Sequence, residues 1–176
     1  MNNTQAQVLI TTDRLHLSLL EAQPDAAFIY ELLNSPGWKT FIGDRKVHSV
    51  EEAQNYISTR LASSYLKHGF GLYKVALKDG TPLGICGLLK RDHLLNVDIG
   101  YAMLPQHEGQ GYTYEAAQAT LKYAKDTLGF EVVLGITDTE NTASQKLLEK
   151  LGFRFVKSGF LEDFEGESMV YEIRLT

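Results

Sequence analysis

The segment Gln106-His107-Glu108-Gly109-Gln110-Gly111-Tyr112 has the residue types and the spacing of an anion site. It follows an apolar run over residues 97–104 that predicts a strand, and it opens a run over residues 112–128 that predicts a helix. Glycines permit a tight turn whose successive N–H groups point at one spot, and the N-terminus of the helix adds positive potential there. The segment is therefore suited to binding a pyrophosphate.

Two common phosphate loops do not match this segment. A dinucleotide fingerprint would need a third glycine at the position of Tyr114, and a Walker loop would need a Gly-Lys-Ser/Thr tripeptide that the chain lacks. What remains is the pattern Gln106-x-x-Gly109-x-Gly111. Two glycines spaced in this way also occur in ordinary strand-to-helix turns, so the loop alone leaves both interpretations open.

Further blocks follow and precede the loop in a recognisable order. They are residues 69–73 (GFGLY), 84–92 (GICGLLKRD), 98–101 (DIGY) and 141–153 (NTASQKLLEKLGF). Together with the glycine loop, they resemble the GCN5-related N-acetyltransferases (GNAT), and their order and spacing are similar to the RimJ/RimL-type branch. The resemblance extends from about residue 11 to the C-terminus.

The resemblance implies that the partner is acetyl-CoA, a cosubstrate whose diphosphate would be held by main-chain N–H groups of the loop. Its pantetheine arm would lie along the strand at residues 98–104, which would splay from the strand at residues 132–136. The residues expected to bind the coenzyme are Tyr101, Met103, Leu104, Gln106, Gly109, Gln110, Gly111, Tyr112, Thr113, Asn141, Ser144 and Leu147.

The resemblance also implies two catalytic candidates. A main-chain N–H near residues 101–103 would stabilise the oxyanion, and Ser144 would donate a hydrogen bond to the departing sulfur. Many family members carry a tyrosine seven residues after the asparagine of this block, but this chain has Leu148 there. Asp98 is the candidate base, with a simple paired carboxylate as the alternative. Asn141 and Ser144 would equally suit the start of a helix.

The expected reaction moves an acetyl group to a primary amine by direct attack in a ternary complex. An α-amine has a pKa of ~7.8 and a lysine ~10.4, so a lysine needs roughly 3.5 kcal/mol more to become neutral at pH 7. This favours the α-amine of a protein or peptide. Trp38, Phe41 and Tyr73 are candidates for the acceptor pocket or for the core. A small-molecule acceptor, a non-catalytic acyl-CoA-binding module and an unrelated nucleotide-binding protein are the alternatives.

Composition also indicates which classes of partner are not expected. The net charge is −5 with no long basic block, which argues against nucleic acid as the main partner. No apolar run is long enough for a membrane span and residues 1–10 are too polar for a signal peptide, so we expect no membrane association and a cytoplasmic protein. The five histidines lack metal-ligand spacing, so no metal is expected. Cys86 sits in an apolar run and is expected to be a buried thiol. A monomer or a homodimer fits equally well.

A length of 176 residues predicts a single domain, 1–176, with a loose tail over about residues 1–10. Residue patterns predict helices at 25–33, 49–66, 112–128 and 142–151, and a loop or short turn at 38–44. Strands are expected at 14–19, 72–78, 83–90, 96–104, 132–136, 153–160 and 168–175. The predicted fold class is α/β (α+β), a GNAT-like mixed, mostly antiparallel sheet flanked by helices. One central strand–helix–strand unit, residues 96–136, would place its two strands in parallel.

Overall fold

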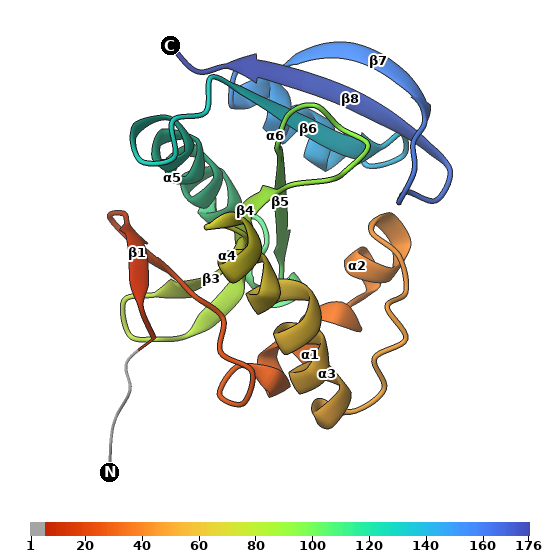
Figure 1. Ribbon diagram of the computed structural model, residues 1–176. Coiled ribbons are helices and arrows are strands. Elements are labelled where there is room, and N and C mark those ends of the chain that lie inside the picture. The colour runs from red at the N-terminus through yellow and green to blue at the C-terminus, as the bar shows by residue number, and fades with distance from the viewer. Residues whose placement is uncertain (1–5) are drawn as a thin grey trace.

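The computed structural model describes residues 6–176. Its centre is an eight-stranded sheet with strand order β1-β2-β3-β4-β5-β6-β8-β7 (Figure 1). Neighbouring strands are antiparallel except for β5 and β6, which are parallel. The strands are β1 (Val8–Thr11), β2 (Leu15–Ser18), β3 (Leu72–Leu77), β4 (Pro82–Leu89), β5 (Asp98–Met103), β6 (Val132–Asp138), β7 (Arg154–Phe160) and β8 (Glu167–Arg174). The expected mixed, mostly antiparallel sheet is confirmed.

Helices cover both faces of this sheet. One face, here called the front, packs against α1 (Ala26–Leu33), α2 (Pro36–Phe41), α3 (Val50–Tyr56) and α4 (Ala62–His68). The back face packs against α5 (Tyr112–Asp126) and α6 (Thr142–Lys150). A π-helical segment, Ile57–Leu61, joins α3 to α4, and a 3₁₀ turn, Pro105–His107, precedes the glycine loop. None of the helices in residues 6–176 has the length and apolar character that crossing a membrane requires.

Two apolar cores hold the layers together. On the back, Ala116 and Ala117 of α5 and Leu148 of α6 pack against strand residues that include Ile99. On the front, the helices pack against a separate group of strand residues that includes Ile85. Successive strand residues point to opposite faces, so this division fixes which side chains of β5 and β6 face each layer.

Helix boundaries follow the residues that favour them. Ser49 is the N-cap of α3, and its hydroxyl accepts a hydrogen bond from Glu52 N at 3.1 Å, a role that serine favours. Gly69, Gly129 and Gly152 follow α4, α5 and α6 with φ of 79°, 77° and 100°. The left-handed backbone that these glycines adopt ends a helix at little steric cost.

The parallel pair β5–β6 is short, and this opens the sheet. Register partners are only Asp98 with Leu134 and Ile99 with Gly135. Beyond them, β5 continues beside β4 as far as Met103, while β6 continues beside β8 to Asp138. The two strands therefore separate after these two pairs. This leaves an unpaired gap between their carboxyl ends, here called the split.

The N-terminal region and α2 differ from the sequence-based expectation. Residues 8–11, assigned to a loose tail, form β1, whose Ile10 pairs with Leu17 of β2 and is buried. Residues 1–5 lie outside the described residues. The expected loop at 38–44 begins inside a helix, because Pro36 is at the first helical position and Trp38 buries its ring in the front core.

Candidate active site

The glycine loop has the backbone geometry of an anion cradle. Gly109 and Gly111 have φ of 78° and 81°, and Gly111 is the N-cap of α5. A Cβ atom placed on Gly109 would have no neighbour within 4 Å, so the space above it is open. Residues 108–111 are exposed. The positive φ values need glycine, and they turn the chain so that the free N–H groups at the start of α5 face solvent.

Arg14, which directly precedes β2, contacts this loop although sequence reasoning did not select it. Its Nη1 donates to Gln110 O at 3.0 Å, and its Nε forms an ion pair with Glu115 Oε2 at 2.7 Å. Nothing in the local sequence links residue 14 to residue 115, and Arg14 is only the first residue of the strand predicted at 14–19.

The split exposes main-chain groups of β5. Leu104 N donates to Leu83 O at 2.8 Å across the β4–β5 ladder. Because bonded and non-bonded pairs alternate in an antiparallel ladder, the main-chain groups of Tyr101 and Met103 point to the opposite edge, toward β6. On that edge, the ladder within residues 6–176 ends at Ile99. Amides of the expected oxyanion segment therefore face the split.

Asn141 and Ser144 begin α6 beside the same gap. Asn141 Oδ1 accepts from Ser144 N at 3.1 Å, so Asn141 caps the helix as its residue type favours. The Ser144 hydroxyl lies 2.8 Å from the hydroxyl of Tyr101 on β5. Burial raises the pKa of Tyr101 to about 12, so its phenol stays protonated. The side chain of Tyr101 thus meets Ser144 across the split.

Asp98 is a buried carboxyl on the front face of β5. It is 2% exposed, and Arg91 Nε lies 3.0 Å from its Oδ1. Burial raises the pKa of Asp98 to about 6, although the charges of Arg91 and His93 oppose that rise. The guanidinium of Arg91 also lies 4.5 Å from the ring of Phe164. The carboxyl therefore changes charge close to neutral pH, at the closed end of the split.

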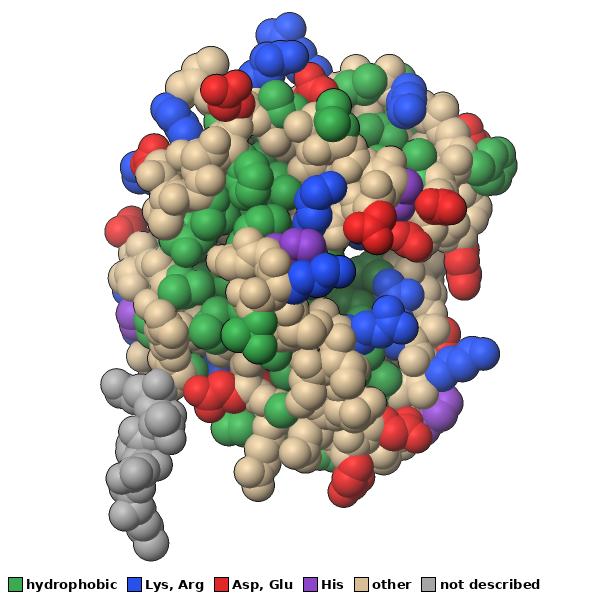
Figure 2. Space-filling view, in the orientation of Figure 1, with side chains coloured by type: hydrophobic (Ala, Val, Ile, Leu, Met, Phe, Trp, Pro, Cys, Tyr) green, Lys and Arg blue, Asp and Glu red, His purple; other side chains and the backbone are tan. Residues whose placement is uncertain are grey.

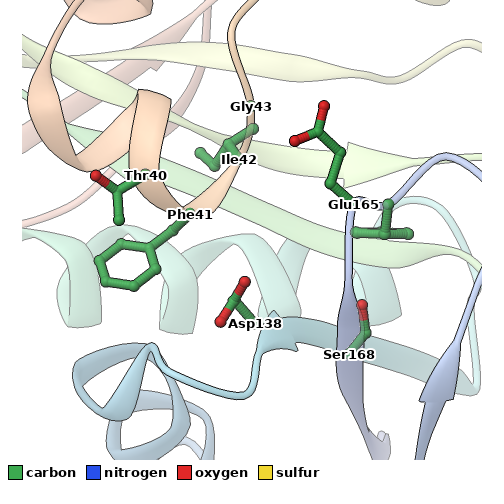
Figure 3. Close-up of a pocket in the computed structure, with 8 residues that line it drawn as sticks. Thr40, Phe41, Ile42, Gly43, Asp138, Glu165 and Ser168 are labelled. Carbon is green, nitrogen blue, oxygen red and sulfur yellow. The ribbon is translucent and has the colours of Figure 1, made fainter.

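A hollow on the front face lies between α2 and the loop that joins β7 to β8 (Figure 3). It spans about 340 Å³, including space open to solvent, and its polar lining includes Asp138, Glu165 and Ser168. Figure 2 shows that both acidic and basic side chains border a hollow on this side of the molecule. Gly135 faces Leu148 on the back, so Asp138, three residues on, points to the front.

Only one of the three aromatic residues predicted for an acceptor pocket lines this hollow. Phe41 does so and is 37% exposed. Trp38 and Tyr73 are 6% and 1% exposed and belong to the front and back cores. Neither lines the hollow, and both rings pack in the cores, which is the second of the two roles that the sequence left open.

The remaining predicted coenzyme residues lie around the loop and the split. Gln106 donates to Glu31 Oε1 at 3.1 Å, which directs its side chain toward α1. Met103 and Leu104 are buried, whereas Tyr112, Thr113 and Leu147 are partly exposed. Cys86 is buried, as expected, and burial raises the pKa of its thiol to about 12. Residues 6–176 contain no group of three His, Cys, Asp or Glu side chains arranged to hold a metal.

Comparison with known proteins now decides the family. A family model described as the acetyltransferase (GNAT) domain matches residues 14–154. The chain belongs to the GNAT acetyltransferase family. It is 32% identical over 154 residues to an uncharacterized N-acetyltransferase of Bacillus subtilis, YjdG, with 83% of this chain and 89% of that protein covered. As a GNAT protein, it is an acetyl-CoA-dependent acyltransferase.

Solved structures show the same fold. An acetyltransferase from Agrobacterium tumefaciens superposes with a TM-score of 0.81 at 21% identity and covers 99% of both chains. RimL, a ribosomal L7/L12 α-N-protein acetyltransferase in complex with coenzyme A, has a TM-score of 0.80 at 14% identity and covers 96% of this chain and 98% of its own. At these identities the likeness concerns the GNAT fold alone.

One helix position distinguishes this GNAT enzyme from the pattern that its sequence resembles. Leu148 stands where many relatives place a tyrosine, and it is 1% exposed in the back core. A Cβ on Gly135 would lie 2.5 Å from Leu148 Cδ2, so the leucine packs directly onto the β6 backbone. This position contributes packing here, and the phenol nearest to Ser144 comes from β5.

Proposed function

We propose that this GNAT enzyme, as a member of the RimJ/RimL-type branch, acetylates the α-amine of a protein or peptide by direct attack on acetyl-CoA in a ternary complex in the cytoplasm. The observation that carries the proposal is the split itself. It opens immediately after the Ile99–Gly135 pair, beside the glycine loop and the first turn of α6, which carries Ser144. A thioester delivered there meets free amides of β5 on one side.

The coenzyme's diphosphate binds to the N–H groups of residues 109–113, and its pantetheine arm pairs with the free edge of β5. Asn141 retains its NH₂ group for a pantetheine carbonyl, because only its Oδ1 is used by the cap. The amide of Tyr101 or of Met103 stabilises the oxyanion that forms when the amine attacks, since a fixed N–H dipole in a dry site needs no reorganisation.

The leaving sulfur and the amine proton need separate partners. Ser144 donates a hydrogen bond to the thiolate, because a serine hydroxyl is too weak an acid to transfer its proton readily. Asp98 receives the amine proton, directly or through water. Its pKa of about 6 makes it ionised at neutral pH and a closer match to an α-amine than an ordinary carboxyl would be.

The front hollow is the proposed acceptor entrance. It lies on the same face as Asp98, and its lining carries the carboxyl groups of Asp138 and Glu165. Carboxylates attract the ammonium form of an amine to the site. The similarity to RimL, which acts on the α-amine of a ribosomal protein according to its name, supports a protein acceptor. A small-molecule amine is the second candidate, because the hollow is open to solvent.

An acceptor screen tests the proposal. Thiol release from saturating acetyl-CoA is measured with peptides that copy ribosomal N-termini, with the same peptides blocked at the α-amine, and with small amines. We expect release with the free peptides and none with the blocked ones. Release only with small amines would transfer the assignment to the second candidate. Coenzyme binding without release from any acceptor would identify a non-catalytic acyl-CoA module.

A further inference from the structure

Arg14 makes three contacts with the glycine loop and the start of α5. Its Nη1 donates to Gln110 O at 3.0 Å, its Nε lies 2.7 Å from Glu115 Oε2, and its guanidinium lies 4.5 Å from the centre of the Tyr112 ring. These partners surround Gly111. A residue from the edge of the sheet therefore holds the exposed glycine turn from outside.

The contact with Gln110 O fixes an amide as well as a carbonyl. In a trans peptide, the C=O of one residue and the N–H of the next are coplanar and point in opposite directions. No peptide bond in residues 6–176 is cis. When the guanidinium holds Gln110 O, the N–H of Gly111 must point away from Arg14. A loop with glycines at 109 and 111 would otherwise be free to rotate this peptide plane.

Glu115 holds the guanidinium in place. Its Oε1 accepts from Thr12 Oγ1 at 2.6 Å and from Arg14 N at 3.0 Å, while its Oε2 pairs with Arg14 Nε. Burial acts to raise the pKa of Glu115, but these hydrogen bonds outweigh it and the pKa is lowered. The carboxylate is thus charged one turn from the anion cradle, where Arg14 neutralises it.

We propose that Arg14 is a positioning residue for the diphosphate of the acyl-CoA: by holding the Gln110 carbonyl, it orients the Gly111 N–H toward the phosphates. The inference rests on the proposed function, since it assigns a role within the same coenzyme site. It identifies a determinant of affinity that lies about a hundred residues before the loop and touches the loop rather than the coenzyme.

Coenzyme fragments separate this role from a general effect on folding. Binding is measured by calorimetry for coenzyme A and for dephospho-coenzyme A, which lacks the 3′-phosphate. Turnover is measured with S-acetylpantetheine, which lacks the diphosphate. For Arg14→Gln we expect about tenfold weaker binding of both coenzymes, because one charge-assisted hydrogen bond to phosphate is lost. The kcat/KM for S-acetylpantetheine should equal that of the unmodified protein.

Companion variants separate orientation from charge. Arg14→Lys keeps the charge but cannot hold Gln110 O and Glu115 together, so it should restore binding only in part. In the double variant Arg14→Gln/Glu115→Gln, the uncompensated carboxylate is gone, yet binding should stay weak. Lys122→Gln is the matched control, because it breaks an exposed ion pair with Asp126 at the far end of the same helix. It should change neither the binding of the two coenzymes nor the turnover of S-acetylpantetheine.

Each contrary result has a distinct meaning. If coenzyme A fails to bind the unmodified protein, the proposed function and this inference fall together. If the unmodified protein binds and Arg14→Gln binds equally well, only the inference is overturned. Full rescue by the double variant would reduce Arg14 to a counter-charge, and unchanged binding of dephospho-coenzyme A would mean a direct contact with the 3′-phosphate; either result overturns it. If Arg14→Gln does not fold, Arg14→Lys and Glu115→Gln undergo the same comparison.

Discussion

Asp98 makes the stability of the protein depend on pH in a direction opposite to that of most carboxyl groups. Its pKa is about 6 in the folded protein against an ordinary 3.8, because burial outweighs the charge of Arg91. The folded protein thus holds this proton more tightly than the unfolded chain does. The resulting stability is complete below about pH 4 and is lost as the pH rises through 6. The difference corresponds to about 3 kcal/mol, since one pKa unit is about 1.4 kcal/mol.

Asp98→Asn removes this titration and keeps the size of the side chain. Urea unfolding at pH 4 and at pH 8 gives the free energy of unfolding of both proteins. Relative to the unmodified protein, the variant should gain about 3 kcal/mol between the two pH values. Asp126→Asn is a control of opposite sign, because the pKa of the exposed Asp126 is lowered, chiefly by its hydrogen bond from Lys122. If the free energies of unfolding of Asp98→Asn and of the unmodified protein differ by the same amount at both pH values, the raised pKa is refuted.

The same variant tests the catalytic role. If Asp98 accepts the amine proton, kcat/KM of the unmodified enzyme rises with pH through about 6 as the carboxyl ionises. That limb of the profile should be absent in Asp98→Asn, and turnover should fall although the variant is spared the loss of stability that the unmodified protein shows between pH 4 and pH 8. Retention of the limb would leave Asp98 as a structural partner of Arg91 only.

Four further substitutions test the site and its support. Gly109→Val should abolish coenzyme A binding in calorimetry and cost roughly 1–2 kcal/mol in unfolding, because φ there is 78°; retained binding would contradict the cradle. Ser144→Ala should lower kcat more than it weakens coenzyme binding, and an unchanged kcat would remove Ser144 from the mechanism. Leu148→Ala should cost about 2–5 kcal/mol. Gly135→Ala should also destabilise, but less in the Leu148→Ala background, since a Cβ there would lie 2.5 Å from the leucine; strict additivity would contradict the direct contact.

The order of the elements could be predicted from the sequence because each carries a local signal. Ser49 with Glu52, the Asp79-Gly80 pair and Gly152 mark boundaries through interactions that span only a few residues. The glycine loop was visible for the same reason. Strand β1 was missed because the segment 8–11 is short and becomes a strand only by pairing with β2.

Long-range contacts account for what the sequence did not reveal at the site. Trp38, Phe41 and Tyr73 are all aromatic, and no local pattern says which of them remains exposed. Only the packing of α2 and β3 against the two cores separates Phe41 from the others. The contact between Arg14 and Glu115 depends on β2 and α5 lying together, which a single sequence does not encode in any spacing.

The contact between Tyr101 and Ser144 offers a physical reason why position 148 can be a leucine and not a tyrosine. A phenol with a pKa of about 12 does not protonate a coenzyme thiolate, because a thiol has a pKa of ~8.5 and the transfer would be uphill. The two hydroxyls lie 2.8 Å apart, and when Tyr101 is the donor, the serine proton is free to turn toward the split. In the proposed mechanism, Tyr101 would then direct the serine hydroxyl, a role that needs no second phenol on α6. Leu148 serves the back core, where it packs directly onto Gly135 and leaves little room for a larger ring.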